Sequence, residues 1–174
     1  AFLELPESCD PDPEVDRYTR YLEWVDPDRE LALLRHGFDR LMAARPANRP
    51  EGIVWGDARL GNIMVVDDFK TVAVMDWEQP SLGGALHDLG WWLWTDHNQT
   101  AAQGIPPLAG MGDRAETIAL WSEVCGKSAA DIEWYEAFAC FKMECLAIRM
   151  MALRDMPLRG EPGSGTARLL ERMD

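Results

Sequence analysis

Three oxygen-bearing side chains at defined spacing are the residues of this sequence best suited to chemistry. Asp57 and Asn62 lie five positions apart, and Asp76 follows fourteen residues after Asn62. In kinase-type phosphoryl transfer, an aspartate accepts the proton of the attacking hydroxyl, and an asparagine five positions later binds magnesium. Magnesium prefers hard oxygen ligands, and a second aspartate supplies them. The spacing therefore indicates a site for magnesium-assisted phosphoryl transfer.

The elements that must position these side chains are short strands. Three segments are rich in β-branched residues and are predicted strands, namely residues 52–55, 62–66 and 71–75. Residues 56–61 are the predicted loop between the first two strands, and residues 67–70 are the turn of a hairpin. A hairpin returns the chain to its starting edge, so Asn62 and Asp76 can face one metal ion while Asp57 stands nearby.

Helical periodicity flanks the strands on both sides. Apolar residues recur at helical spacing in predicted helices at residues 13–25, 27–45, 86–96, 113–125, 131–155 and 166–173. Pro27 suits the first turn of the second helix, and Asp113 and Asp131 are expected N-caps or first-turn acids. The strands are too few for a core of their own. The order of elements therefore predicts an α+β domain dominated by helix.

Composition narrows the classes of partner. The 174 residues include 47% hydrophobic and 27% charged residues, which is typical of one globular domain, with a net charge of −13. This charge disfavours nucleic acid and favours a cationic or metal-bound small molecule. Neither a membrane-spanning stretch nor a signal peptide is present, so we expect a cytoplasmic protein that binds no membrane. A homo-oligomer, or contact with a further lobe of the same protein, is the expected association.

A family resemblance rests on the run V-W-G-D-A-R-L-G-N-I-M-V, followed by V-A-V-M-D-W-E and H-D-L-G. These motifs resemble those of the aminoglycoside phosphotransferase and choline kinase-like family, which has the protein-kinase-like fold. That family reads H-G-D-x-x-x-x-N, then I-D-W or I-D-x-E, then a D-L-A-like helix start. The resemblance is strong over residues 52–95 and covers the flanking helices only by order and length. It implies ATP as phosphoryl donor, Mg²⁺ as cofactor, and an aminoglycoside-, choline- or sugar-like hydroxyl as acceptor.

The resemblance also implies a role for each matching position. Asp57 would be the catalytic base, and Asn62 and Asp76 would bind the magnesium ion that accompanies the nucleotide. Arg59 would hold a positive charge near the transferred phosphate. Asp88 would be a structural acid that braces the catalytic loop.

Other residues near the motifs carry less specific expectations. Trp55 stands where the family has histidine, and an indole donates one hydrogen bond but accepts none. We therefore expect its ring to be buried against the helix that begins near Leu86, where packing replaces polar bracing. Glu78 is expected either to assist a second metal ion or to pair with a basic side chain. Residues 96–98, Asp-His-Asn, are candidates for lining a substrate cleft.

A larger departure concerns the nucleotide clamp. Kinase-like catalysis also needs a glycine-rich loop and a strand lysine, and none of the three lysines lies in a V-A-I-K-like strand. Residues 1–174 are therefore expected to be the C-terminal lobe alone, without the N-terminal lobe and inactive by themselves. Two other functions stay open: a non-catalytic kinase-like binding module, and a magnesium-dependent phosphohydrolase that uses water as the acceptor.

Overall fold

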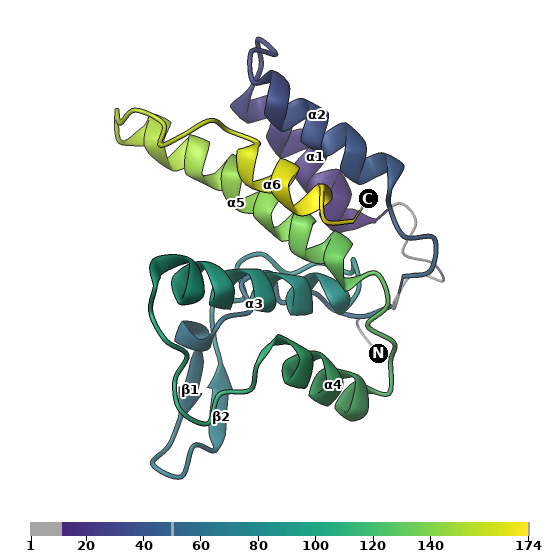
Figure 1. Cartoon of the computed structure of the whole chain (residues 1–174), viewed down its shortest axis with the longest axis vertical. Coiled ribbons are helices and arrows are strands. Elements are labelled where there is room, and N and C mark those ends of the chain that lie inside the picture. Colours follow the sequence, from purple (N-terminus) through teal and green to yellow (C-terminus); the bar gives the residue numbers. More distant parts are fainter. Residues whose placement is uncertain (1–11, 50, 174) are drawn as a thin grey trace.

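Helices and one small hairpin make up the computed structural model of this chain, which describes residues 12–49 and 51–173. The helices are α1 (Pro13–Val25), α2 (Ala32–Ala43), α3 (Leu86–Gln99), α4 (Arg114–Cys125), α5 (Ile132–Leu153) and α6 (Ser164–Leu170). Two 3-10 turns, η1 (Leu60–Asn62) and η2 (Ala101–Gln103), and the strands β1 (Ile63–Val65) and β2 (Thr71–Val74) complete the fold (Figure 1). The predicted α+β class, dominated by helix, is confirmed.

Helix α5 is the centre of the hydrophobic core. It contacts α1, α2, α3 and α6, and its side chains Phe138, Phe141 and Cys145 are fully buried. Rings stack along it, with the centroids of Trp134 and Phe138 5.1 Å apart. A helix that is apolar on most of its faces is stable only when other elements cover it, as they do here. Across the described ranges, no helix is both long and apolar enough to cross a membrane.

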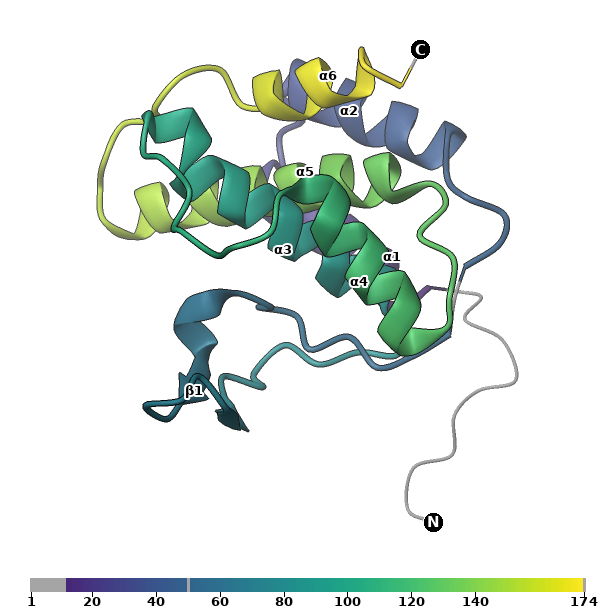
Figure 2. The same cartoon turned by 60° about the horizontal axis from the view of Figure 1, so that its bottom comes forward.

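The hairpin lies on the side of α3 that faces away from α2 and α6, as Figures 1 and 2 both show. Its strands are antiparallel, with Ile63 opposite Val74 and Met64 opposite Ala73, and an irregularity follows Met64. The predicted hairpin is therefore confirmed, with slightly shorter strands. Most of its side chains are exposed, so the hairpin is a projection from the helical core and contributes little to it.

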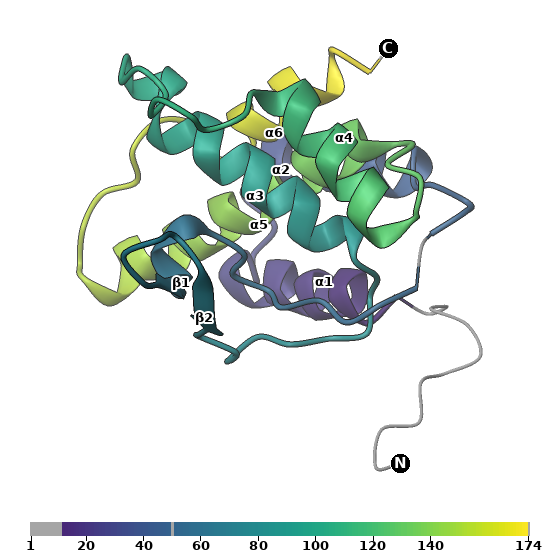
Figure 3. The ribbon, with the colours of Figure 1, turned by 90° about the horizontal axis from the view of Figure 1, so that it is seen from below.

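The predicted strand at residues 52–55 is wrong. The structure has a single bridge there, in which Val54 and Ser81 exchange backbone hydrogen bonds of 2.8 and 3.1 Å. Figure 3 shows the two extended segments that carry this bridge running side by side across the helical face. A β-branched composition favours extended backbone, but a strand also needs a paired neighbour along its length.

Helix boundaries differ from the predictions mainly at α2. This helix begins at Ala32 because the Asp26 carboxylate accepts hydrogen bonds from the backbone N–H groups of Glu30 and Leu31, which holds residues 26–31 in a turn. Asp113 caps α4 with a capping box, as expected. Asp131 precedes α5 without a side-chain cap. Smaller shifts occur at the ends of α3, α5 and α6.

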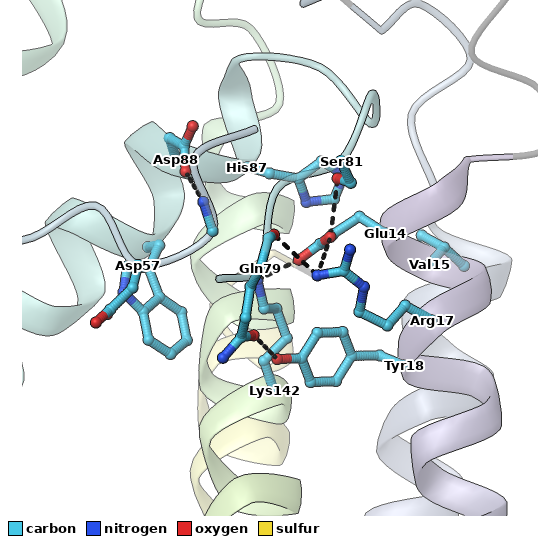
Figure 4. A network of polar contacts seen from close by, with 12 residues as sticks. Glu14, Val15, Arg17, Tyr18, Asp57, Gln79, Ser81, His87, Asp88 and Lys142 are labelled. Carbon is cyan, nitrogen blue, oxygen red and sulfur yellow. Dashed lines mark hydrogen bonds and ion pairs between the residues drawn. The ribbon is translucent and has the colours of Figure 1, made fainter. Parts of the chain in front are cut away.

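A buried ion pair joins α1 to α5. Lys142 Nζ lies 2.5 Å from Glu14 Oε1, and the two side chains are 2% and 0% exposed. Ser81 Oγ donates to the other carboxylate oxygen at 3.0 Å, so the segment after the hairpin joins the same network (Figure 4). Burial alone would raise the pKa of Glu14, but the neighbouring ammonium group of Lys142 holds that pKa below its ordinary value.

Further polar contacts fix this segment to α1. The guanidinium group of Arg17 donates to the backbone oxygens of Gln79 and Pro80, at 2.8 Å each. The Tyr18 hydroxyl donates to the side-chain oxygen of Gln79 at 3.3 Å. These contacts give α1 a direct hold on residues 79–81, which follow the predicted metal ligand Asp76 (Figure 4).

Removing one partner of the buried ion pair should destabilise the fold. We expect Lys142→Met to lower the free energy of unfolding by about 3 kcal/mol, because the Glu14 carboxylate stays buried without its compensating charge. The double variant Glu14→Gln/Lys142→Met should lose less, since no buried charge remains. Urea unfolding followed by circular dichroism measures both. Equal losses in the single and double variants would contradict this account.

Acid should lower the free energy of unfolding by weakening the Glu14–Lys142 ion pair. Because the folded pKa of Glu14 lies below its ordinary value of 4.5, its contribution to stability is complete above that pH. Below about pH 4.5 the unfolded chain takes up the proton first, so stability falls with pH. Unfolding midpoints measured between pH 7 and pH 3 should fall more steeply for the native chain than for Glu14→Gln/Lys142→Met. Parallel pH profiles would contradict the prediction.

Candidate active site

Asp88, in the first turn of α3, holds the start of the Asp57 loop (residues 56–62). Its two carboxylate oxygens accept hydrogen bonds from the backbone N–H groups of Trp55 and Gly56, at 2.6 and 2.9 Å. Burial raises the pKa of Asp88, and the two backbone hydrogen bonds act in the opposite direction. One side chain thereby fixes two successive peptide groups immediately before Asp57.

Gly56 is required at this point by both conformation and space. Its φ is +99°, and a Cβ atom added there would lie 2.4 Å from the backbone oxygen of Gln79. Only glycine adopts this conformation without strain and lets the two backbones approach so closely. The Asp57 loop is thus pressed against the segment that α1 holds.

The carboxylate of Asp57 is the centre of the site. Oδ2 accepts hydrogen bonds from Asn62 Nδ2 at 2.7 Å and from Arg59 Nε at 2.8 Å. Oδ1 accepts one from Trp91 Nε1 at 3.0 Å, and the side chain is 20% exposed. The structure therefore brings together three residues predicted from sequence, Asp57, Arg59 and Asn62. It adds Trp91, which sequence analysis missed.

A signal for Trp91 exists in the sequence. It lies three positions after Asp88, and residues three apart share one face of a helix. Because Asp88 reaches the Asp57 loop from the first turn of α3, Trp91, one turn later on the same face, also lies near that loop. The run of tryptophans at positions 91, 92 and 94 hid this signal, because it reads as core packing.

Asn62 and Asp76 are joined through the hairpin backbone. The N–H of Met75, next to Asp76, donates to the backbone oxygen of Asn62 at 2.9 Å. The side-chain amide nitrogen of Asn62 also donates to the backbone oxygen of Asp57 at 3.0 Å, so its Oδ1 is the atom left to bind a cation. Asp76 is exposed at the end of β2, with a positive φ of 60°.

The donor set of these two residues fits magnesium. Across the described residues, no group of three or more His, Cys, Asp or Glu side chains could hold a metal ion. An all-protein cage is not what magnesium requires, because it keeps several waters and binds through one or two carboxylates plus the phosphates of a substrate. The amide oxygen of Asn62 and the carboxylate of Asp76 are suitable ligands of that kind.

Glu78 lies two residues beyond Asp76 and is exposed. In the described part of the chain it has no hydrogen bond or ion pair with another side chain. The structure therefore does not bring Glu78 into the network of side chains around Asp57.

The expectation that the Trp55 ring is buried against α3 is met only in part. The ring is only half-buried, at the edge of the small cluster of Ala58, Trp91 and Ala139. Its Nε1 donates to the backbone oxygen of Met75 at 2.7 Å. The indole N–H therefore ties the residue before the Asp57 loop to the end of β2. The ring of Trp77 lies beside it, with centroids 5.9 Å apart, and is itself 49% exposed.

Cavities open along α3 near its C-terminal end. One of about 520 Å³ lies between α3, α5 and α6 and includes His97, Asn98 and Glu144 in its lining. An adjoining cavity of about 440 Å³ includes Asp96 and His97. Residues 96–98 thus line hollows of a size that suits small molecules. A third groove of about 480 Å³ is almost wholly apolar and runs from Ala58 to the exposed side chains of α4.

Comparison with known proteins supports the reading of these motifs. A model of the phosphotransferase enzyme family matches residues 3–125, which include the Asp57 loop, the hairpin and Asp88. A crystal structure of a protein from Ralstonia eutropha JMP134, provisionally named an aminoglycoside phosphotransferase, is similar with a TM-score of 0.65 and 22% sequence identity. The similarity covers 98% of this chain and 53% of that protein. The chain thus spans about half the length of this relative.

Loss of the Asp88 carboxylate should loosen the start of the Asp57 loop. In Asp88→Asn one oxygen becomes an amide nitrogen, which leaves either Trp55 N–H or Gly56 N–H without an acceptor. We expect a loss of about 1–3 kcal/mol in unfolding free energy. Hydrogen exchange at these two amides should accelerate, while exchange in α5 follows global stability only. Unchanged protection of both amides would show that Asp88 does not hold the loop.

Proposed function

Because the chain belongs to the phosphotransferase enzyme family, we propose that it carries the catalytic-loop half of a small-molecule kinase. This enzyme transfers the γ-phosphoryl group of ATP to a hydroxyl group. The observation that carries the proposal is the Asp57 carboxylate, held by Arg59, Asn62 and Trp91 at the mouth of a hairpin that ends in Asp76.

The proposed roles follow from the contacts of each side chain. Asp57 accepts the proton of the acceptor hydroxyl as that oxygen attacks phosphorus. Asn62, through Oδ1, and Asp76 hold the magnesium ion, which neutralises charge on the phosphates when bound. Arg59 is paired with Asp57 and is 40% exposed, so its guanidinium group is also accessible to the transferred phosphate.

The nucleotide-clamping lobe is proposed to meet this chain at the hairpin. The hairpin and the residues after it expose a row of apolar side chains, which are Met64, Val65, Val66, Phe69, Val72, Val74, Met75 and Trp77. Exposed apolar patches of this extent mark surfaces that another domain covers. A kinase binds its nucleotide between two lobes, and the hairpin carries the proposed metal ligands toward that interface. We expect residues 1–174 alone to bind MgATP no tighter than about 1 mM, or about −4 kcal/mol.

The acceptor is proposed to be an aminoglycoside-, choline- or sugar-like alcohol in the cytoplasm, where ATP is available. The net charge of −13 favours a cationic acceptor over an anionic one. Residues 96–98, which line the two cavities at the end of α3, are proposed to contribute to its binding.

Replacement of the proposed base tests this function. Asp57→Asn in the full-length enzyme should fold normally and transfer phosphate at least about 100-fold more slowly, the usual scale for a general base. Asp67→Asn, the same change in the exposed hairpin turn, is the matched control and should be fully active. Transfer to aminoglycosides, choline-like alcohols and sugars is followed with labelled ATP. Normal transfer by Asp57→Asn would remove it from the mechanism.

The same assay separates the alternative functions. Phosphate release from MgATP without any acceptor would identify a phosphohydrolase. Absence of both transfer and release in the native full-length enzyme would identify a binding module.

The proposed metal ligand Asp76 gives a second test. Asp76→Ala should raise the magnesium concentration required for nucleotide binding by the full-length enzyme about tenfold or more, because one of two protein oxygen ligands is lost. Asp67→Ala serves as the comparison, since Asp67 is also exposed, lies in the hairpin turn and is not a candidate metal ligand. Magnesium titrations of nucleotide binding measure both variants. An equal response of the two would contradict a special role for Asp76.

A further inference from the structure

The two oxygens of Asp57 differ in how many hydrogen bonds they already accept. Each oxygen of an ionised carboxylate accepts about two hydrogen bonds. Oδ2 receives two from described residues, Asn62 and Arg59, and Oδ1 receives one, from Trp91. Oδ1 is therefore the oxygen that keeps room for a further donor.

We infer that Trp91 is a positioning residue, which aims Oδ1 of Asp57 at the acceptor hydroxyl, and that the Glu14–Lys142 ion pair beneath its ring supports it. This inference rests on the proposed function, because it assigns the proton-accepting atom of the proposed base. The proton of the acceptor hydroxyl passes to Oδ1 while the hydroxyl oxygen forms its bond to phosphorus and the bond to the leaving ADP breaks. Trp91 itself exchanges no proton.

The indole of Trp91 is fixed in place by its surroundings. The residue is 4% exposed and packs against Ala58 and Ala139. The ring of Trp94 lies beside it, with centroids 6.0 Å apart. Ala58 follows Asp57 directly, so the ring contacts the Asp57 loop through packing as well as through its N–H. A donor held this way restricts rotation of the carboxylate.

Lys142 lies against the face of the same ring. Its Nζ is 5.0 Å from the Trp91 ring centroid and 4.9 Å from that of Tyr18, while its hydrogen bond goes to Glu14. A cation over an indole face is attracted to the ring and draws electron density toward itself. In a buried site this polarisation strengthens the N–H as a donor. A continuous row of contacts therefore runs from α1 through α5 and α3 to Asp57.

Packing alone does not account for this arrangement. A phenylalanine ring would fill most of the same space between Ala58 and Ala139. The indole adds one polar atom, Nε1. This atom donates to Oδ1 of Asp57, the oxygen that accepts no hydrogen bond from Arg59 or Asn62. The N–H is the feature that distinguishes tryptophan here.

The contact itself can be tested without an activity assay. In ¹⁵N-tryptophan-labelled protein, the indole signal that disappears in Trp91→Phe belongs to Trp91. We expect Asp57→Asn to shift that signal and to speed its exchange with water about tenfold, since a hydrogen bond to a charged acceptor becomes one to a neutral amide. Asp67→Asn should leave every indole signal in place. An unchanged Trp91 signal in Asp57→Asn would overturn the inference.

The positioning role is tested by kinetics in the full-length enzyme, with MgATP and its best acceptor from the panel above. Trp91→Phe should lower kcat about 10- to 100-fold and leave both KM values unchanged, because the base is present but poorly aimed. Trp24→Phe makes the same substitution at an exposed ring on α1 that lines neither proposed acceptor cavity, and it should keep kcat within about twofold of the native value. Equal kcat in the two variants would overturn the positioning role.

To test whether Lys142 supports Trp91, the variant must leave no unpaired charge in the core. Glu14→Gln/Lys142→Met removes both buried charges, so it avoids the unpaired carboxylate that Lys142→Met creates. We expect it to shift the Trp91 indole signal and to lower kcat about threefold. If both are unchanged, the ion pair does not act through Trp91. A native enzyme that transfers no phosphate would refute the proposed function. An active native enzyme in which Trp91→Phe and Trp24→Phe have equal kcat would refute only this inference.

Discussion

The buried ion pair between Glu14 and Lys142 is the interaction on which the remaining architecture depends. Two opposite charges removed from water must meet in good geometry, because each loses its hydration. The pair therefore fixes α1 against α5 at one point. Ser81 is bonded to the same carboxylate, and Arg17 holds the two carbonyls before it. Through these contacts the segment after the hairpin acquires a fixed path.

Helix α3 positions the Asp57 loop relative to the segment that α1 holds. Asp88 holds the backbone before Asp57, and Trp91, one turn further, holds the Asp57 side chain. The helix can serve this purpose because it packs closely on α5. At Gly90 a Cβ atom would lie 2.6 Å from the Cβ of Tyr135, so a larger residue would push the two helices apart. Glycine at this position therefore influences the distance between the Asp57 loop and the core.

Sequence reasoning succeeded where the interacting residues are close along the chain. Asp57, Arg59 and Asn62 lie within one short loop, and the hairpin is marked by two β-branched runs around a turn. It failed for contacts that cross the fold. Trp91 lies 34 positions from Asp57, and Lys142 lies 128 positions from Glu14. For Trp91 the only signal was its three-residue spacing from Asp88, and no local pattern pointed from Lys142 to Glu14, so Lys142 was interpreted only as a charge within a helix.

The failed prediction of a strand at residues 52–55 has a related cause. Local composition specifies an extended backbone, whereas pairing is decided by whatever the fold places alongside. Here the single bridge between Val54 and Ser81 is enough to keep residues 52–55 extended, because α1 already holds residues 79–81 in place. Trp55 shows the same limit at the level of one side chain. Its hydrogen bond to Met75 depends on where the hairpin ends, which its own sequence neighbourhood does not reveal.

The two-stranded sheet has a consequence for the behaviour of this chain in concentrated solution. Among the described residues each strand pairs only with the other, so both outer edges carry backbone donors and acceptors outside the ladder, and the Val74 oxygen among them accepts from the Trp77 indole N–H. Edges of this kind are templates for strand addition by another molecule, especially when their side chains are apolar. Phe69, at 85% exposure, stands at the tip of the hairpin, and Lys70 is the adjacent gatekeeping charge. We therefore expect copies of the chain with uncovered strand edges to self-associate through these edges, and a domain that pairs with the edges to raise solubility.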